Sequence, residues 1–252
     1  MCPPSRGLVC IRWFSDDALE RRKAMAASRS NPVESGAAIP EKEYPVPSTA
    51  GSAAWSREIA TRDRARVLSR LLEQTPIIPA VRSSEFLTDA AQAPGKVVYF
   101  LFGNPEEIGD MVHTVVTAGK VPIVNLDLVS GFARDQAAIS FLARRDVQGI
   151  ISTHPEPLRA ARNLGLFAIK RTFLLDSAAL HNALRSLDQF LPDALEVLPA
   201  MAAPHIVARL REERSELPII GGGLVHTLRE IDDLINQGLT SISVSDCKLW
   251  IA

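Results

Sequence analysis

Eight short apolar runs recur at nearly even spacing from residue 77 onward, and they constrain the fold of this chain more than any other feature. Each run is rich in Val, Ile and Leu and is almost continuously apolar, as are strands buried on both faces of a parallel sheet. Amphipathic helical segments separate the runs. The runs are Ile77–Arg82, Lys96–Phe102, Val121–Asp127, Gln148–Thr153, Leu166–Phe173, Ala194–Pro199, Leu217–Gly222 and Thr240–Ser245.

This alternation of strands and helices predicts an α/β chain folded as a (β/α)8 TIM barrel. A doubly wound open sheet is the competing arrangement, but eight units and a short final segment favour the closed barrel. Helix-end signals agree with the pattern. Asn104-Pro105 offers an N-cap and a first helical residue, and glycines are expected to end three helices. These are Gly119, Gly165 and Gly238.

The N-terminal part of the chain has a different composition. Residues 1–56 are rich in Pro, Ala, Gly and Ser and lack a sustained apolar period, so they are predicted to form a disordered or low-complexity extension. The barrel domain is expected to span residues 57–252. It should begin with a helix over 57–74 that carries arginines on one face and stops before Pro76.

The bulk composition excludes several classes of protein. Hydrophobic residues make up 46% and charged residues 23% of the chain, which is typical of a soluble globular protein. No apolar run approaches the roughly 20 residues that span a bilayer, so no membrane partner is expected. The 3 cysteines lack metal-ligand spacing. We therefore expect free thiols in a reducing cytoplasm and no metal site.

Polar side chains gather at the carboxyl ends of the apolar runs. In a (β/α)8 barrel this end of the strands carries the functional residues. Packing alone does not require such side chains, so we take them as candidate binding residues. They are Arg82, Asn125, Asp127, Ser152, Thr153, Lys170, Arg171, Glu196, Gly221 to Gly223, Ser243 and Ser245.

The consecutive glycines Gly221, Gly222 and Gly223 are the most informative of these candidates. Glycine lets the backbone approach an anion and expose consecutive N–H groups, and the helix that follows would add its positive N-terminal end. Loops after the seventh and eighth strands are the usual phosphate position in this fold. With Ser243 and Ser245 on the eighth run, the sequence predicts a phosphate cradle. A tight strand-to-helix turn is the alternative.

Other candidates also have structural explanations. Asp127 could cap the helix that follows it, and Lys170 could point into the helix layer. The histidines lack ligand spacing, although His154 directly follows the fourth run. Glu196 is harder to explain by structure alone, because a carboxylate inside a strand needs a partner.

Motifs along most of the chain, taken in order, resemble the glycerol-3-phosphate-responsive antiterminator family. They are NLDLVSGFARDQAAISFL, GIISTHPEPLRAARNLGLFAIKRTFLLDSAAL, DALEVLPAM, PIIGGGLVHTLREIDDLINQG and SISVSDCKLW, between Ile77 and Trp250. The resemblance implies a (β/α)8 barrel that binds glycerol 3-phosphate as an effector, with no other cofactor and no catalytic residue. It also implies action on a nascent mRNA leader to prevent transcription termination.

The same resemblance implies which residues bind the ligand. They are Asp127, Ser152, Arg171, Glu196, Gly222, Gly223, Ser243 and Ser245. The sequence departs from the family's usual pattern at Asn125, where His is often found, at His154, where a basic residue usually follows Ser-Thr, and at Lys170, where Gln is common. These departures bear on the choice of ligand more than on the fold.

The expected RNA partner leaves little trace in the composition. A formal net charge of -1 gives no overall basic excess, so an RNA surface would have to be local. Arg57, Arg64 and Arg66 on the first helix are the candidates for RNA contacts. A homo-oligomer is compatible with such a regulator, although no residue argues for one.

Two functions of other classes stay open. An isomerase or aldolase acting on a phosphorylated substrate would use Lys170 as a Schiff base, or Asp127 and Glu196 as acid and base. Against Lys170, the resemblance selects its neighbour Arg171 for the interior, and adjacent strand residues face opposite sides. The second alternative is a ligand sensor that works through a protein partner.

Overall fold

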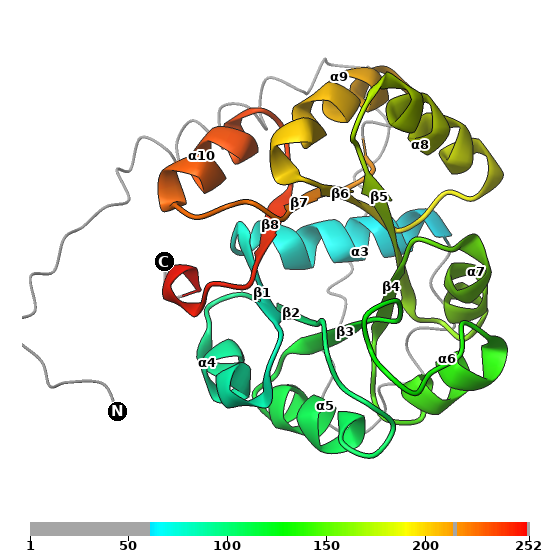
Figure 1. Cartoon of the computed structure of the whole chain (residues 1–252), viewed down its shortest axis with the longest axis vertical. Coiled ribbons are helices and arrows are strands. Elements are labelled where there is room, and N and C mark those ends of the chain that lie inside the picture. Colours follow the sequence, from blue (N-terminus) through cyan, green and yellow to red (C-terminus); the bar gives the residue numbers. More distant parts are fainter. Residues whose placement is uncertain (1–60, 214–215, 251–252) are drawn as a thin grey trace, which may run out of the picture. The chain divides into compact units, whose positions relative to one another are not determined.

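A computed structural model describes residues 61–213 and 216–250 of the chain. The predicted extension over residues 1–56, and Arg57 with it, lies outside the described residues. Within them, eight parallel strands pair in sequence order, and β8 returns to pair with β1, which closes the barrel (Figure 1). The predicted (β/α)8 TIM barrel is therefore confirmed, and the open sheet is excluded.

The strands coincide closely with the apolar runs. They are β1 (Ile77–Val81), β2 (Val97–Phe100), β3 (Val121–Asn125), β4 (Gly149–Ser152), β5 (Phe167–Phe173), β6 (Ala194–Leu198), β7 (Ile219–Gly222) and β8 (Ser241–Val244). Every strand residue of β1 to β4, β7 and β8 is buried, as expected for strands covered on both faces.

Helices surround the barrel, and short 3-10 turns complete three of the connections (Figure 1). The α-helices are α3 (Thr61–Glu73), α4 (Leu87–Gln92), α5 (Ile108–Thr117), α6 (Gln136–Ala143), α7 (Pro155–Asn163), α8 (Ser177–Gln189), α9 (Ala203–Glu213) and α10 (Leu228–Asn236). The 3-10 turns are η1 (Ser84–Phe86), η2 (Ala200–Ala202) and η3 (Cys247–Leu249).

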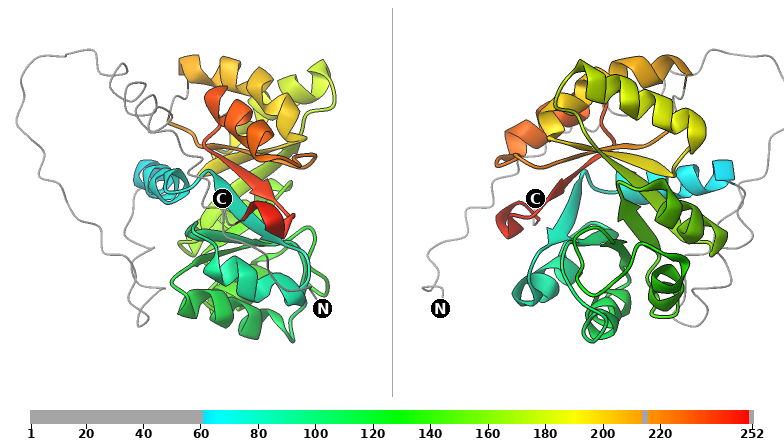
Figure 2. Two further views of the ribbon diagram at one scale, coloured as in Figure 1. Left: turned by 90° about the vertical axis from the view of Figure 1, so that its left-hand side faces the viewer. Right: turned by 45° about the vertical axis from the view of Figure 1, so that its right-hand side comes forward.

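Helix α3 closes one end of the barrel. Its side chains Leu68 and Leu72 are buried in the interior core with residues near the starts of the strands, such as Val97 and Phe167. The Ser241 hydroxyl donates to the carbonyl oxygen of Leu72 at 3.0 Å. Figure 2 shows α3 across the end opposite to that toward which the strands point. The carboxyl ends of the strands are therefore the open end.

The helix boundaries confirm most of the end signals and correct one. Gly119, Gly165 and Gly238 have φ of 73°, 83° and 100° directly after α5, α7 and α10, in the left-handed region that favours glycine. Helix α5 starts at Ile108, later than predicted. The Asn104 side chain instead accepts from the backbone N–H groups of Glu106 and Glu107, which holds a turn before the helix.

Candidate ligand-binding site

Alternation along each strand decides which strand-end side chains enter the barrel. Ile123 and Ile169 belong to the interior core. Two residues further along the same strands, Asn125 and Arg171 continue the inward face. Both are buried, at 0% and 8% exposure, so polar groups replace the apolar core at the carboxyl end of the barrel.

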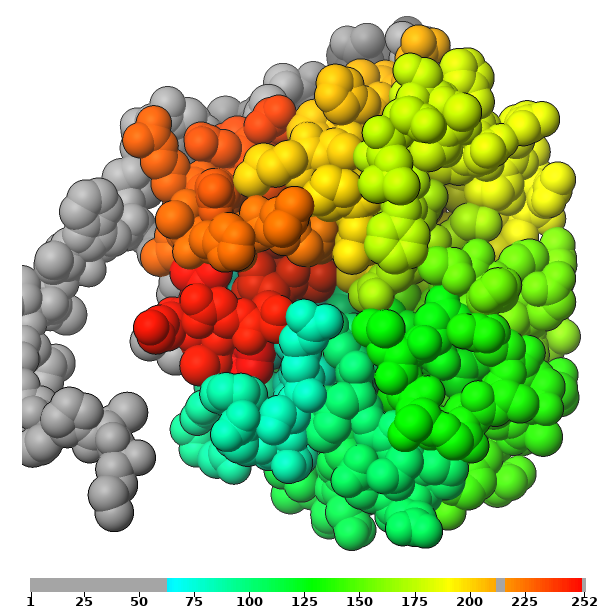
Figure 3. Space-filling view, in the orientation of Figure 1, coloured from blue at the N-terminus to red at the C-terminus, as the bar shows by residue number. Residues whose placement is uncertain are grey.

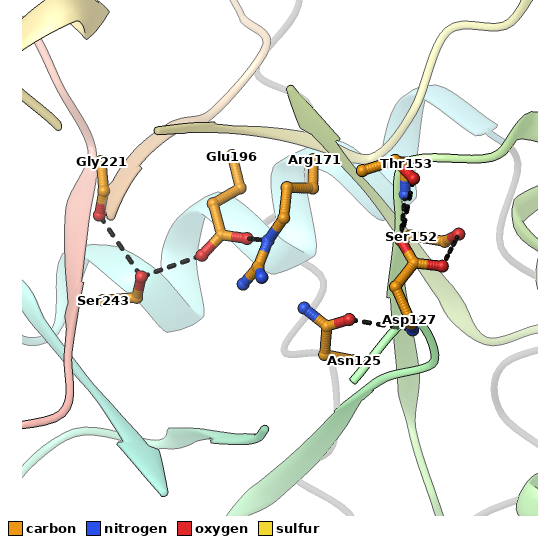
Figure 4. A network of polar contacts seen from close by, with 8 residues as sticks. All are labelled: Asn125, Asp127, Ser152, Thr153, Arg171, Glu196, Gly221 and Ser243. Carbon is orange, nitrogen blue, oxygen red and sulfur yellow. Dashed lines mark hydrogen bonds and ion pairs between the residues drawn. The ribbon is translucent and has the colours of Figure 1, made fainter. Parts of the chain in front are cut away.

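Glu196 is the centre of this polar layer. It is completely buried in β6, and Arg171 Nε donates to its Oε2 at 2.7 Å. The Ser243 hydroxyl on β8 donates to its Oε1 at 2.9 Å. Arg171 on β5 and Ser243 on β8 thus provide the partners that a buried carboxylate requires (Figure 4). The sequence predicted these three residues separately, and the fold joins them.

The three glycines at the end of β7 have three different roles. A Cβ on Gly221 would lie 2.7 Å from Leu239 Cδ2 and 3.0 Å from Ala200 Cβ, so Gly221 permits close packing against the helix layer. A Cβ on Gly222 would lie 2.7 Å from the Ser243 hydroxyl, on the inner side. Gly223 has φ of 76°, and a Cβ there would make only an ordinary contact, at 3.7 Å with Leu198 Cδ2. Of the three, only Gly222 faces the interior side chains Ser243 and Glu196.

Three consecutive backbone amides, beginning at the last of these glycines, have no hydrogen-bond partner in the described part of the chain. Leu224 also has a positive φ, of 59°, so the chain turns sharply over two residues. No described residue accepts from the N–H groups of Gly223, Leu224 or Val225. Gly222 pairs with Ser243 in register, and Ser245 lies two residues beyond Ser243 and is exposed. The arrangement can therefore offer amides and a hydroxyl to an anion.

Helix α10, which follows this loop, begins with a capping box formed by Thr227 and Glu230. The Glu230 carboxylate accepts from the N–H groups of His226 and Thr227, and Thr227 Oγ1 accepts from the Glu230 N–H. These bonds satisfy the N–H groups of His226, Thr227 and Glu230, whereas those of Leu228 and Arg229 in the first turn of α10 have no partner among the described residues. The amides from Gly223 to Val225 likewise face no partner in the described part of the chain.

Asp127 belongs to a second cluster rather than to the Glu196 network (Figure 4). Its carboxylate accepts from Ser152 Oγ at 2.9 Å, from Thr153 N at 2.7 Å and from Arg134 Nε at 3.1 Å. Thr153 Oγ1 donates to it as well. These bonds fasten the loop after β3 to the end of β4. They occupy both Asp127 and Ser152, two of the predicted ligand residues.

The suggestion that Asp127 caps the next helix is also corrected. Asp135 is the N-cap of α6, and its side chain accepts from the backbone N–H of Ala138 at 2.9 Å. Although burial of Asp127 acts to raise the pKa of its carboxyl, the hydrogen bonds from Thr153, Ser152 and Arg134 hold that pKa below its ordinary value. Asp127 therefore stays ionised and holds the loop after β3 against the end of β4.

Lys170 lies on the outer face of β5 and not in the barrel. Its pKa is lowered, first by burial and then by the like charge of Arg159, while Glu156 acts in the opposite direction. Both of these residues lie on α7. A Schiff-base lysine has to reach the barrel interior. The position of Lys170 does not support the enzyme alternative.

Two of the candidate RNA-binding arginines, Arg64 and Arg66, are described, and they lie on α3 at the closed end. Arg64 is 7% exposed, and its guanidinium donates to the carbonyl oxygen of Leu166 at 3.3 Å. The predicted exposed position of Arg64 was therefore wrong. Arg66 is exposed and pairs with Glu216 at 2.9 Å. Arg64 lies on the side of α3 that covers the end of the barrel, and its side chain is therefore buried.

Sequence reasoning missed Tyr99 altogether. Its phenol oxygen and the Nδ2 atom of Asn125 are buried and have no hydrogen-bond partner among the described residues. Burial raises the pKa of Tyr99 well above its ordinary value, and Glu196 raises it further, while Arg171 opposes them. Tyr99 sits in an unbroken apolar run with Phe100, so only strand alternation could have assigned it to the interior.

The described residues contain neither a metal-ligand cluster nor a membrane-spanning helix. No group of three or more His, Cys, Asp or Glu side chains in residues 61–213 and 216–250 is placed to hold a metal ion. None of the helices in that part of the chain is long and apolar enough to cross a membrane.

Comparison with known proteins adds to this geometry. A family model described as glycerol-3-phosphate responsive antiterminator matches residues 77–250. The chain is 33% identical over 184 residues to the uncharacterized protein YgcP of Escherichia coli strain K12, covering 73% of this chain and 95% of that protein. The match therefore spans β1 to η3.

Solved structures give the same picture. The glycerol uptake operon antiterminator regulatory protein from Listeria monocytogenes is 27% identical, with a TM-score of 0.64, covering 70% of this chain and 95% of that one. A glycerol uptake operon antiterminator-related protein from Thermotoga maritima is 26% identical, also with a TM-score of 0.64, covering 70% and 98%. Several aldolases match at 12% identity or less, which shows a shared fold alone.

Proposed function

Since the chain belongs to the glycerol-3-phosphate responsive antiterminator family, we propose that it binds glycerol 3-phosphate at the open end of its barrel and then acts on an mRNA leader. The ligand is an effector, and no further cofactor takes part. Relatives of similar structure bear the name of antiterminator proteins of the glycerol uptake operon, which supports the regulatory role.

The main support for ligand binding is the set of backbone N–H groups at Gly223, Leu224 and Val225, which have no hydrogen-bond partner among the described residues. They follow β7 and lie beside the end of β8, the usual position for phosphate in this fold. Hydrogen bonds to a charged group contribute roughly 1.5–3 kcal/mol each. Three of them, with Ser245 nearby, approach the roughly -8 kcal/mol of a micromolar complex. Figure 3 shows this face of the barrel, with the loops arranged around its centre.

Arg171 and Glu196 form an ion pair in the barrel interior below these amides. A buried carboxylate alone would repel a phosphate, but its ion pair with Arg171 removes the net charge. Because Asp127 and Ser152 bond each other, we propose that they hold the loop after β3 in place and do not contact the phosphate.

Gly223 offers a sharp test of the cradle, because a Cβ there meets only Leu198 Cδ2 at 3.7 Å. Gly223→Asp adds a carboxylate beside the amides, and Gly223→Asn is the matched neutral control, since both residues tolerate a positive φ. Calorimetry with glycerol 3-phosphate should show binding at least about ten-fold weaker for Asp than for Asn. Equal affinities in the two variants would mean that the phosphate binds elsewhere.

The proposed binding to an mRNA leader is tested in a separate experiment. Fluorescence anisotropy with a leader transcript of a glycerol uptake operon, at low salt and with or without glycerol 3-phosphate, should show ligand-dependent binding that weakens as salt rises. Arg66→Ala tests the exposed arginine of α3. No transcript binding at low salt with saturating ligand would contradict the proposed RNA binding and leave the proposed ligand binding standing.

The barrel is proposed to sense its ligand without converting it. Lys170 on the outer face supports this, because no substrate carbonyl inside the barrel can reach it. Borohydride treatment in the presence of triose phosphates should therefore leave Lys170 unmodified, as peptide mass analysis would show. A covalent adduct at Lys170 would favour the aldolase-type enzyme instead.

A further inference from the structure

Two completely buried side chains on neighbouring strands have polar atoms without a partner in the described residues. They are the phenol oxygen of Tyr99 on β2 and Nδ2 of Asn125 on β3, both on side chains with 0% exposure. Buried polar groups in native proteins nearly always have partners, and an unpaired one is destabilising. Two such groups in the barrel interior indicate a site that donates hydrogen bonds to a bound group.

The orientation of the Asn125 amide is set by a neighbour. Its Oδ1 accepts from the backbone N–H of Asp127 at 3.0 Å, so Nδ2 is the free end. Figure 4 shows that end directed toward the guanidinium of Arg171, across the barrel interior. Asn125 therefore aims two N–H donors into the layer that contains Arg171 and Glu196.

Tyr99 faces the same layer. It belongs to the interior core and pairs in register with Ile123, which lies two residues before Asn125 on the inward face of β3. Burial and the Glu196 charge both raise the pKa of Tyr99, so the phenol keeps its proton and can donate. Tyr99 thus adds a donor from the opposite wall to the one that carries Glu196.

The charge of this layer decides what it can hold. Arg171 bonds Glu196 through Nε, and no described residue accepts from its Nη groups. Each oxygen of Glu196 accepts one hydrogen bond from a side chain, and a carboxylate oxygen has capacity for another. The layer offers both donors and acceptors at zero net formal charge. A hydroxyl group, which donates and accepts at once, fits it better than a second anion does.

We infer that Tyr99 and Asn125 form a hydroxyl-binding floor with Arg171 and Glu196, and that this floor selects a phosphorylated polyol over a simple phosphate ester. The floor lies below the amides of the β7 loop, because Glu196 and Ser243 contact the inner side of Gly222. The inference rests on the proposed function, since it requires the phosphate of the same ligand to occupy those amides.

The test compares two ligands that differ only in hydroxyl groups, glycerol 3-phosphate and n-propyl phosphate. Calorimetry gives their affinity ratio for the wild type, for Tyr99→Phe and for Asn125→Leu. Wild type should prefer the polyol about ten-fold or more, and Tyr99→Phe should reduce that preference about five-fold. The affinity for n-propyl phosphate should change by less than about two-fold. Asn125→Leu should act in the same direction.

Ser241→Ala is the matched control, because it removes a buried hydroxyl at the closed end of the barrel, where Ser241 bonds Leu72. It should leave the affinity ratio unchanged, whatever it does to stability. A merely structural role of Tyr99 would lower stability without moving that ratio.

The outcomes are separable. An unchanged ratio in Tyr99→Phe, or a wild-type ratio near one, overturns the floor and leaves phosphate binding intact. Tighter binding of 3-phosphoglycerate than of glycerol 3-phosphate overturns the preference for a neutral hydroxyl. Absence of binding to every phosphorylated ligand overturns the proposed function, and the floor with it.

Discussion

At the scale of single residues, Asp127 shows how neighbours can occupy a candidate ligand residue. Its position after a strand predicted a binding role, and the same position brings it next to Ser152 and Thr153 on the adjacent strand. With Arg134 as a further donor, the carboxylate receives bonds from three residues. The consequence is a loop held in one conformation beside the site.

Asp127→Asn should lower the free energy of unfolding by about 1–3 kcal/mol at neutral pH, because an amide nitrogen cannot accept from Thr153. The pKa of Asp127 is below its ordinary value. Its stabilising contribution is therefore present above the ordinary aspartate pKa of about 4 and is lost as pH falls through the lower folded value. Urea denaturation at several pH values measures this.

The variant should consequently lose less stability on acidification than the wild type, and the two curves should converge at low pH. Asp135→Asn is the control, because asparagine is as good an N-cap as aspartate at the start of α6. Parallel pH curves for wild type and Asp127→Asn would contradict the fastening role.

At the scale of elements, β7 and its loop carry the strongest local constraint. Gly221 faces the helix layer, Gly222 faces the Ser243 hydroxyl, and Gly223 turns the chain. One sequence feature, three consecutive glycines, thus has three separate physical causes. The sequence could locate the constraint but could not assign the causes, since each depends on atoms from β8, η2 or the residues before β8.

Gly221→Ala should destabilise the barrel by about 1–3 kcal/mol, because its methyl group would overlap Leu239, Ala200 and Ile242. Gly109→Ala in α5 is the matched control. Its Cβ would meet Arg145 only at an ordinary distance of 3.6 Å. Helix propensity then predicts a gain of roughly 0.5–1 kcal/mol. Urea denaturation that gave both variants the same sign would contradict this packing account.

At the scale of the whole molecule, the helix that covers the barrel and the proposed ligand site lie at opposite ends. Helix α3 covers one end with Leu68 and Leu72, while the polar layer and the β7 amides lie at the other. Leu68→Ala should cost about 2–5 kcal/mol by leaving a cavity under α3. The loss of stability from Leu68→Ala and the gain from bound ligand should be additive, because the two sites share no residues.

Glycerol 3-phosphate at about 100 times its Kd should therefore stabilise wild type and Leu68→Ala equally, by about 2.7 kcal/mol. Thermal denaturation with and without ligand measures both increments. A much smaller increment in Leu68→Ala would mean that α3 and the site are coupled. The shift with ligand also provides a check on the proposed function that is independent of calorimetry.

The apolar periodicity by itself determined the barrel, because only strands covered on both faces tolerate eight such runs with amphipathic helices between them. It also located the strand ends that hold Arg171, Glu196 and Ser243. Tertiary structure alone decided that Glu196 bonds both Arg171 and Ser243, that Asp127 and Ser152 bond each other, and that Arg64 is buried. It also brought Tyr99 and Asn125 to the same layer. The physical reason is that closing a barrel joins strands distant in sequence, and hydrogen bonds and close contacts depend on that closure.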